Sequence, residues 1–257
     1  SFMIGVLGSL EIRHEDRVRP VPTGRTATLI AALALHPNRV VPLAQLTEEL
    51  WGAAPPRSAL HNLRSYASQA RKVLGMPGRL VARTGGYRLI IESADVDADA
   101  FEALLTAAGG ADGAESACVL LEQALALWRG PVAADVPAGP LIAVRARALD
   151  ELRMTAVEEY AAASLRADHG HTVDLVATLR RHVAEHPYRE RAWTQLMLAL
   201  YRAGDPAAAL ETYAQVRLTL ADDLGIAPGP ELATMYRAVR DRDPALDRDR
   251  GSEPALH

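Results

Sequence analysis

The chain of 257 residues is poor in cysteine, lysine and aromatic residues. Its one cysteine, Cys118, excludes an internal disulfide framework and a thiolate-rich metal site, and it suits a reducing compartment. Its one lysine, Lys72, follows an arginine and not a glycine, which excludes a phosphate-binding loop of the G-x-x-x-x-G-K type. Because aromatic residues make up only 5%, the core must rest on leucine, valine and alanine, which favours helices over sheets.

The sequence also lacks long apolar runs. No stretch of about 18 apolar residues is present, which excludes a spanning helix, and no basic stretch precedes an apolar one near the first residues, so no secretory signal is visible. With 49% apolar residues the chain can still bury a core, and its length allows one large or two moderate domains. We therefore expect a soluble cytoplasmic protein that has no membrane partner.

Charge is distributed unevenly along the chain. Residues 1–96 carry 12 basic against 7 acidic side chains, whereas residues 97–257 carry 16 against 25. Within the first part, residues 57–88 hold seven basic residues and no acidic one. This pattern favours a polyanion-binding module joined to a second, acidic module, and the alternative is a solvated basic face without a partner.

The first 94 residues predict a winged helix-turn-helix domain of the α+β class. Apolar alternation up to residue 22 indicates short strands, and helices are expected from about Thr26, from Leu43 to Trp51 and from Ser58 to Leu74. Two further strand-like runs flank residues 84–86, whose two glycines suit a tight hairpin turn. Strands, three helices and a hairpin in this order are typical of the winged form.

The helix over residues 58–74 has the composition of a recognition helix. Leu60, Leu63, Ala67, Ala70 and Leu74 fall in one sector, and the far side is polar without a carboxylate. Small polar residues can meet base edges in a major groove, while arginines at the border bind phosphates. We predict groove contacts from Ser58, His61, Asn62, Ser65, Ser68, Gln69 and Lys72, and phosphate or wing contacts from Arg25, Arg57, Arg64, Arg71, Arg83, Thr84 and Arg88. Tyr87 and Trp51 are interpreted as packing residues.

The remainder of the chain reads as an all-α domain over residues 97–240, followed by a disordered tail at 241–257. Gly170 and Gly204 lie 34 residues apart between helical segments, a period typical of tetratricopeptide repeats, which stack into surfaces that hold protein segments. A generic helical bundle without a groove is the alternative.

One motif suggests metal chemistry. His182-Val183-Ala184-Glu185-His186 matches the H-x-x-E-H pattern of certain zinc proteases, which leaves a zinc-dependent hydrolase as an alternative. No third ligand is evident, and a 34-residue shift places both histidines on the apolar positions Val216 and Leu220. We therefore interpret them as packing residues, and expect no enzyme activity, no catalytic residue, no metal and no cofactor.

Several motifs, in their order along the chain, resemble the Streptomyces antibiotic regulatory proteins. The resemblance extends from Met3 to about Val239 and rests on residues 4–11, 38–41, 50–56, 127–130, 186–202 and 224–232. It implies a winged DNA-binding domain followed by a bacterial transcriptional activator domain. The recognition helix of the family is richer in Thr and Arg around His61, Asn62 and Gln69, so the DNA sequence that this chain binds cannot be inferred from the family.

The resemblance also implies a function and partners. It predicts a nucleoid-associated activator of secondary-metabolite genes that binds direct repeats in double-stranded promoter DNA and recruits RNA polymerase holoenzyme through its sigma or alpha subunit. It implies a homodimer, at least on DNA. The alternative is a tetratricopeptide-like adaptor, or a ligand-responsive regulator, whose main partner is a protein.

Overall fold

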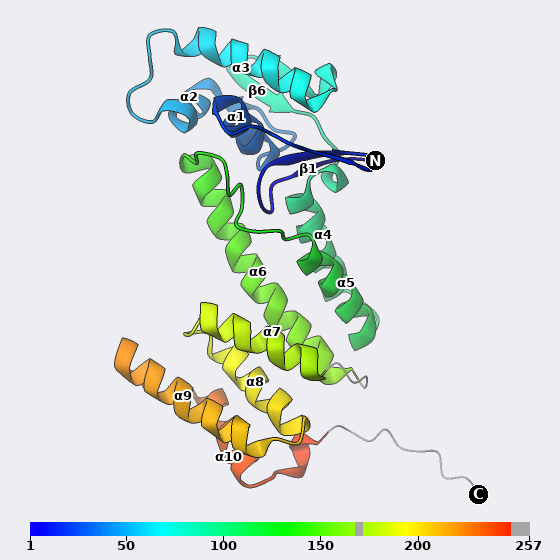
Figure 1. Ribbon diagram of the computed structural model, residues 1–257, viewed down its shortest axis with the longest axis vertical. Helices are drawn as coiled ribbons and strands as arrows, with labels where there is room; N and C mark the ends of the chain where they lie inside the picture. The colour runs from blue at the N-terminus through cyan, green and yellow to red at the C-terminus, as the bar shows by residue number, and fades with distance from the viewer. Residues whose placement is uncertain (168–171, 248–257) are drawn as a thin grey trace, which may run out of the picture. The chain divides into compact units, whose positions relative to one another are not determined.

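A computed structural model describes residues 1–167 and 172–247 of the chain (Figure 1). It divides into two compact units, the first formed by residues 1–107 and 122–153 and the second by residues 108–121 and 154 onward. The predicted boundary between residues 94 and 97 differs from this division, because residues 129–142 hydrogen-bond to the amino-terminal part of the chain. The predicted class, a winged helix-turn-helix followed by a helical domain, is confirmed.

The first unit begins with a small antiparallel sheet in the order β1-β2-β3. Its strands are β1 (Phe2–Gly5), β2 (Glu11–His14) and β3 (Arg17–Pro20). Ile4 pairs with Ile12, and both side chains are buried, so one face of this sheet contributes to the core. The predicted alternation fails in β3, where all four residues are exposed.

Three helices and a second sheet complete the winged fold (Figure 1). The helices are α1 (Arg25–Ala34), α2 (Leu43–Trp51) and α3 (Ala59–Leu74), and the sheet has the order β4-β6-β5 with β4 (Val41–Pro42), β5 (Leu80–Arg83) and β6 (Gly86–Leu89). The pattern did not predict β4, because a two-residue strand has no visible periodicity. A Cβ atom at Gly86 would lie 2.1 Å from the Val41 carbonyl oxygen, so this pairing requires glycine.

A carboxylate and an arginine connect the loop after β1 to the start of α4 (Asp97–Gly109). The Asp97 carboxylate accepts hydrogen bonds from the backbone N–H groups of Val6 and Leu7, at 2.8 and 3.1 Å. Arg129 lies 3.5 Å from Asp97 and 3.1 Å from Glu11, and a Cβ at Gly5 would come within 2.7 Å of its guanidinium. Burial raises the pKa of Asp97, although these hydrogen bonds and Arg129 oppose the rise.

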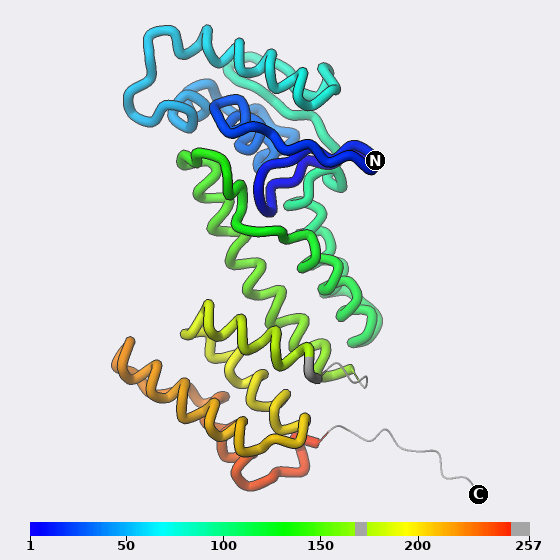
Figure 2. The backbone as a smooth tube through the Cα atoms, viewed as in Figure 1, coloured from blue at the N-terminus to red at the C-terminus, as the bar shows by residue number. Residues whose placement is uncertain are grey.

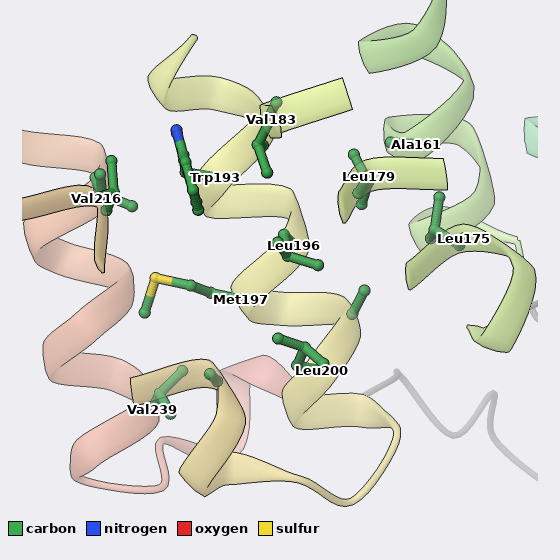
Figure 3. Packing of buried hydrophobic residues seen from close by; sticks show 14 of the residues in the cluster. Ala161, Leu175, Leu179, Val183, Trp193, Leu196, Met197, Leu200, Val216 and Val239 are labelled. Carbon is green, nitrogen blue, oxygen red and sulfur yellow. The ribbon is translucent and has the colours of Figure 1, made fainter. Parts of the chain in front are cut away.

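The second unit is built from helices. Besides parts of α4, α5 (Ala114–Ala126) and α6 (Pro140–Arg166), it contains α7 (Thr172–Glu185), α8 (Glu190–Arg202), α9 (Pro206–Leu224) and α10 (Pro230–Arg240). Trp193, Leu196, Met197 and Leu200 place α8 at the centre of its core, as Figure 3 shows. The backbone tube in Figure 2 shows α8 running into α9 through a tight turn, where Gly204 has a φ of 86°.

This hairpin has the features expected of a repeat. Asp205 caps α9 by accepting a hydrogen bond from the Ala208 N–H at 3.0 Å, and Pro206 occupies the first helical position. Trp193 and the small residue Ala209 are both buried, and α10 packs against both α8 and α9. The matching Gly170 lies outside the described residues.

The tail prediction is wrong for residues 241–247. Pro244–Leu246 form a short 3₁₀ helix, Leu246 is buried, and its carbonyl accepts a hydrogen bond from the Arg202 guanidinium at 2.9 Å. The buried Leu246 side chain and this hydrogen bond therefore anchor the stretch to the second unit. The rest of the predicted tail, residues 248–257, lies outside the described residues.

A buried carboxylate on α6 joins three elements of the second unit. Glu158 hydrogen-bonds to the His182 ring at 3.1 Å and to the Arg189 guanidinium, and Gln195 donates to its backbone carbonyl. Burial alone would raise the pKa of Glu158, but His182 and Arg189 outweigh it and hold the pKa below the ordinary value of 4.5. The ionised carboxylate therefore stabilises the folded unit at neutral pH.

We predict that Glu158→Gln lowers the free energy of unfolding at pH 7 by about 3 kcal/mol, because it removes the negative charge that the Arg189 guanidinium and the His182 ring contact. The stabilisation is present above the ordinary pKa of 4.5 and is lost as the pH falls through the lowered pKa of Glu158, so the difference between parent and variant should shrink as the solution is acidified below pH 4.5. Urea unfolding at several pH values measures it. The exposed neighbour Glu159, with Glu159→Gln, is the control. A pH-independent difference would contradict this assignment.

Candidate nucleic-acid interface

Helix α3 is held in the first unit by one buried stripe. Ala59, Leu63, Ala67, Ala70 and Leu74 are all buried, and the helix packs against α1 and α2. Gly75 ends the helix with a φ of 66°, where a left-handed conformation favours glycine. The predicted stripe contained Leu60 in place of Ala59; this was wrong, because Leu60 is 53% exposed and Ala59 only 7%.

The far side of α3 carries exposed polar and basic side chains. The structure leaves the following predicted contact residues exposed: Arg57, Ser58, His61, Arg64, Ser65, Ser68, Gln69 and Lys72. Asn62 is half-buried. Because residues 57–88 contain no carboxylate, this face presents positive charge and hydrogen-bond donors without a nearby negative charge. Such a face can approach a polyanion without repulsion.

Three of these side chains make hydrogen bonds within the unit. The Thr26 hydroxyl donates to the Gln69 side-chain oxygen at 2.8 Å, which ties α1 to α3. Asn62 donates to the Ser58 hydroxyl at 3.1 Å across the first turn. Sequence reasoning missed Thr26, because a contact between α1 and α3 has no local signal. Gln69 and Asn62 therefore have less freedom to meet a ligand than Ser65, Ser68 or Lys72.

The predicted basic contacts differ in their surroundings. Arg71 is half-buried, and its Nε atom donates to the Leu80 carbonyl at 2.8 Å. This bond connects α3 to the wing, which is the hairpin formed by β5 and β6. Arg64 remains exposed on the helix, whereas Arg25 lies outside it, with its guanidinium 5.6 Å from the centre of the Trp51 ring.

The wing places the remaining candidates near its turn. Arg83 and Thr84 are exposed at the hairpin, where Gly85 has a φ of 82°. Arg88 is half-buried, and its Nε atom has no hydrogen-bond partner among the described residues. Tyr87 is 6% exposed, which supports its interpretation as a packing residue.

A buried glutamate on α2, the helix that packs against α3, binds the start of α6. Glu49 of α2 accepts hydrogen bonds from the backbone N–H groups of Gly139, Leu141 and Ile142, at 2.8, 2.7 and 3.2 Å. These groups lie at the start of α6, where a helix leaves its first N–H groups without partners and favours negative charge. A Cβ at Gly139 would lie 2.6 Å from the carboxylate. Sequence reasoning missed Glu49, because its partners are about 90 residues away.

His182, the first residue of the histidine motif, has a structural role. His182 is 5% exposed and is bonded to Glu158, and the described residues contain no group of three or more side chains that could hold a metal ion.

None of the helices in the described ranges is both long and apolar enough to cross a membrane.

Comparisons with known proteins assign both parts of the chain. Residues 21–89 match the family "Transcriptional regulatory protein, C terminal", and residues 96–240 match "Bacterial transcriptional activator domain". The chain is 36% identical to the transcriptional regulator RedD of Streptomyces coelicolor, covering 95% of this chain and 71% of that protein. It is 35% identical to the regulatory protein DnrI of Streptomyces peucetius, covering 99% and 97% respectively.

A solved structure is also similar. Mycobacterium tuberculosis EmbR, determined in complex with a low-affinity phosphopeptide, matches with a TM-score of 0.84 and 34% identity. The match covers 95% of this chain and 66% of the EmbR chain. The similarity therefore extends over the winged fold and the helical region together.

We predict that Glu49→Ala lowers the free energy of unfolding by about 2 kcal/mol, since three helix-terminal N–H groups lose their acceptor. Glu48→Ala, at an exposed position of the same helix, should change it by less than about 0.5 kcal/mol. Thermal and urea unfolding of the two variants test this. Equal effects of the two substitutions would show that the Glu49 contacts contribute nothing.

Proposed function

The chain belongs to the Streptomyces antibiotic regulatory protein family, and from this premise we propose that it is a sequence-specific DNA-binding activator of transcription. Members of this family are transcriptional regulators and not enzymes. The proposed targets are direct repeats in double-stranded promoter DNA upstream of secondary-metabolite genes, which places the protein with the nucleoid in the cytoplasm.

The observation that carries this proposal is the acid-free outer face of α3. His61, Ser65, Ser68 and Lys72 are exposed on the side opposite the buried stripe, and Arg57 and Arg64 border them. A helix in the major groove needs such small donors toward base edges and cations toward phosphates. In this assignment Arg83 and Thr84 of the wing contact the adjacent sugar-phosphate backbone of the DNA.

The proposed domain roles follow the family. Residues 1–94 supply the DNA contact, and residues 97–240 supply contacts to a second copy on DNA and to the sigma or alpha subunit of RNA polymerase. Since residues 129–142 hydrogen-bond into the amino-terminal part, we expect a fragment that ends at residue 94 to be less stable than one that ends near residue 153.

The second candidate function is a protein-binding adaptor. The second unit contains a groove of about 470 Å³ between α7 and α9, lined among others by Arg180, Trp193, Glu211 and Gln215. Stacked helical hairpins commonly hold peptide segments in such grooves. If the adaptor function were the main one, affinity for DNA would be negligible near physiological salt.

We predict two classes of variant in a fluorescence-anisotropy titration of DNA duplexes. Arg64→Ala removes a phosphate contact, so it should weaken binding to all sequences alike and reduce the slope of log K against log salt by about one. His61→Ala or Ser65→Ala should change which duplex is preferred, with an effect of about 1–3 kcal/mol at one position.

The matched control is Arg17→Ala, at an exposed position on β3 outside the proposed interface, which should leave both affinity and slope unchanged. Arg71→Ala should weaken binding and also destabilise the wing, because its Nε atom holds the Leu80 carbonyl. The proposed function fails if Arg64→Ala, His61→Ala and Ser65→Ala all bind DNA as the parent does.

A further inference from the structure

Leu60 is the one side chain of the expected apolar stripe of α3 that the first unit does not bury. Its neighbours Ala59 and Leu63 are 7% and 0% exposed, whereas Leu60 is 53% exposed. A leucine that is half exposed to water loses part of the free energy that burial of its apolar surface would contribute, and a polar residue could occupy this position without that loss. The chain therefore presents an aliphatic group on the surface of the first turn of this helix.

The surroundings of Leu60 are positively charged. Arg64 follows it by four residues and so lies one turn along on the same edge of the helix, and Arg57 lies in the turn directly before the helix begins. No acidic residue occurs between residues 57 and 88. A partner for Leu60 must therefore offer an apolar group surrounded by negative charge.

A DNA duplex contains such a group. The C5-methyl of thymine is the apolar feature of the major groove, and it stands toward the side of the groove that borders the phosphates of its own strand. The first residues of a recognition helix contact base edges most closely. In the proposed complex Arg64 of α3 and Arg57, in the turn before it, face phosphates, and Leu60 lies on the same edge of α3 as Arg64.

We propose that Leu60 is a specificity-determining residue that packs on the C5-methyl group of a thymine in the bound duplex. This inference rests on the proposed DNA binding and adds one base to it: the preferred site contains a thymine next to the phosphates that Arg57 and Arg64 contact. Leu60 contributes selectivity through apolar contact, whereas His61 and Ser65 contribute it through hydrogen bonds.

The experiment uses a duplex that the full chain selects from random sequences. Each thymine is replaced in turn by uracil, which removes only the methyl group, and Kd is measured by anisotropy for the parent and for Leu60→Ala. At one position the parent should bind the uracil duplex about fourfold more weakly, the value expected for one buried methyl group. Leu60→Ala should bind both duplexes equally at that position and keep any other uracil effects.

Val18→Ala is the matched control, because Val18 is 55% exposed on β3 of the same unit and outside the proposed interface. It should retain the fourfold effect. Since Leu60 is exposed, Leu60→Ala should keep the parental unfolding temperature, which circular dichroism verifies.

The proposal is overturned if the parent shows no uracil effect at any position, or if every effect persists in Leu60→Ala. Either result would show that Leu60 does not contact a thymine methyl group in the bound duplex. The Arg64→Ala titration separates these cases from a failure of DNA binding itself, because it tests the phosphate contact without any reference to thymine.

Discussion

The buried stripe of α3 is the constraint on which the rest of the candidate interface depends. Ala59, Leu63, Ala67, Ala70 and Leu74 fix the rotation of this helix about its own axis, and small residues at three of the five positions allow neighbouring helices to approach closely. Once this rotation is fixed, the exposed positions are fixed as well. The polar, acid-free face and the exposed Leu60 are therefore consequences of the same packing.

The unit that carries α3 extends beyond the winged fold. Glu49 binds the start of α6, and Asp97 and Arg129 bind the loop after β1, so segments that the family match assigns to the activator domain stabilise the DNA-binding part. Hydrogen bonds from backbone N–H groups to a buried carboxylate are strong and directional, because the acceptor is charged. They fix α2, which packs against α3, to the start of α6 within the first unit.

The sequence predicted the elements of the winged fold well, because α2 and α3 have clear helical periodicity, Gly75 ends α3, and Gly85 lies in the turn between β5 and β6. It could not predict β4, or the exchange of Ala59 for Leu60 in the stripe, because both depend on which neighbour occupies the space. The contacts of Glu49, Gln69 and Arg71 could not be predicted from the sequence either, because each partner belongs to another element of the fold. The exposed face of α3 was predictable because its composition, without any carboxylate, carries the signal.

The most direct test of the central claim places a negative charge on this face. Ser68 is exposed on α3, and Ser93 is exposed outside the proposed interface, so Ser68→Asp and Ser93→Asp form a matched pair. The account predicts that Ser68→Asp weakens binding to the selected duplex roughly a hundredfold, through repulsion by the phosphates, and that Ser93→Asp binds as the parent does. Equal affinity of a folded Ser68→Asp variant and the parent would contradict it.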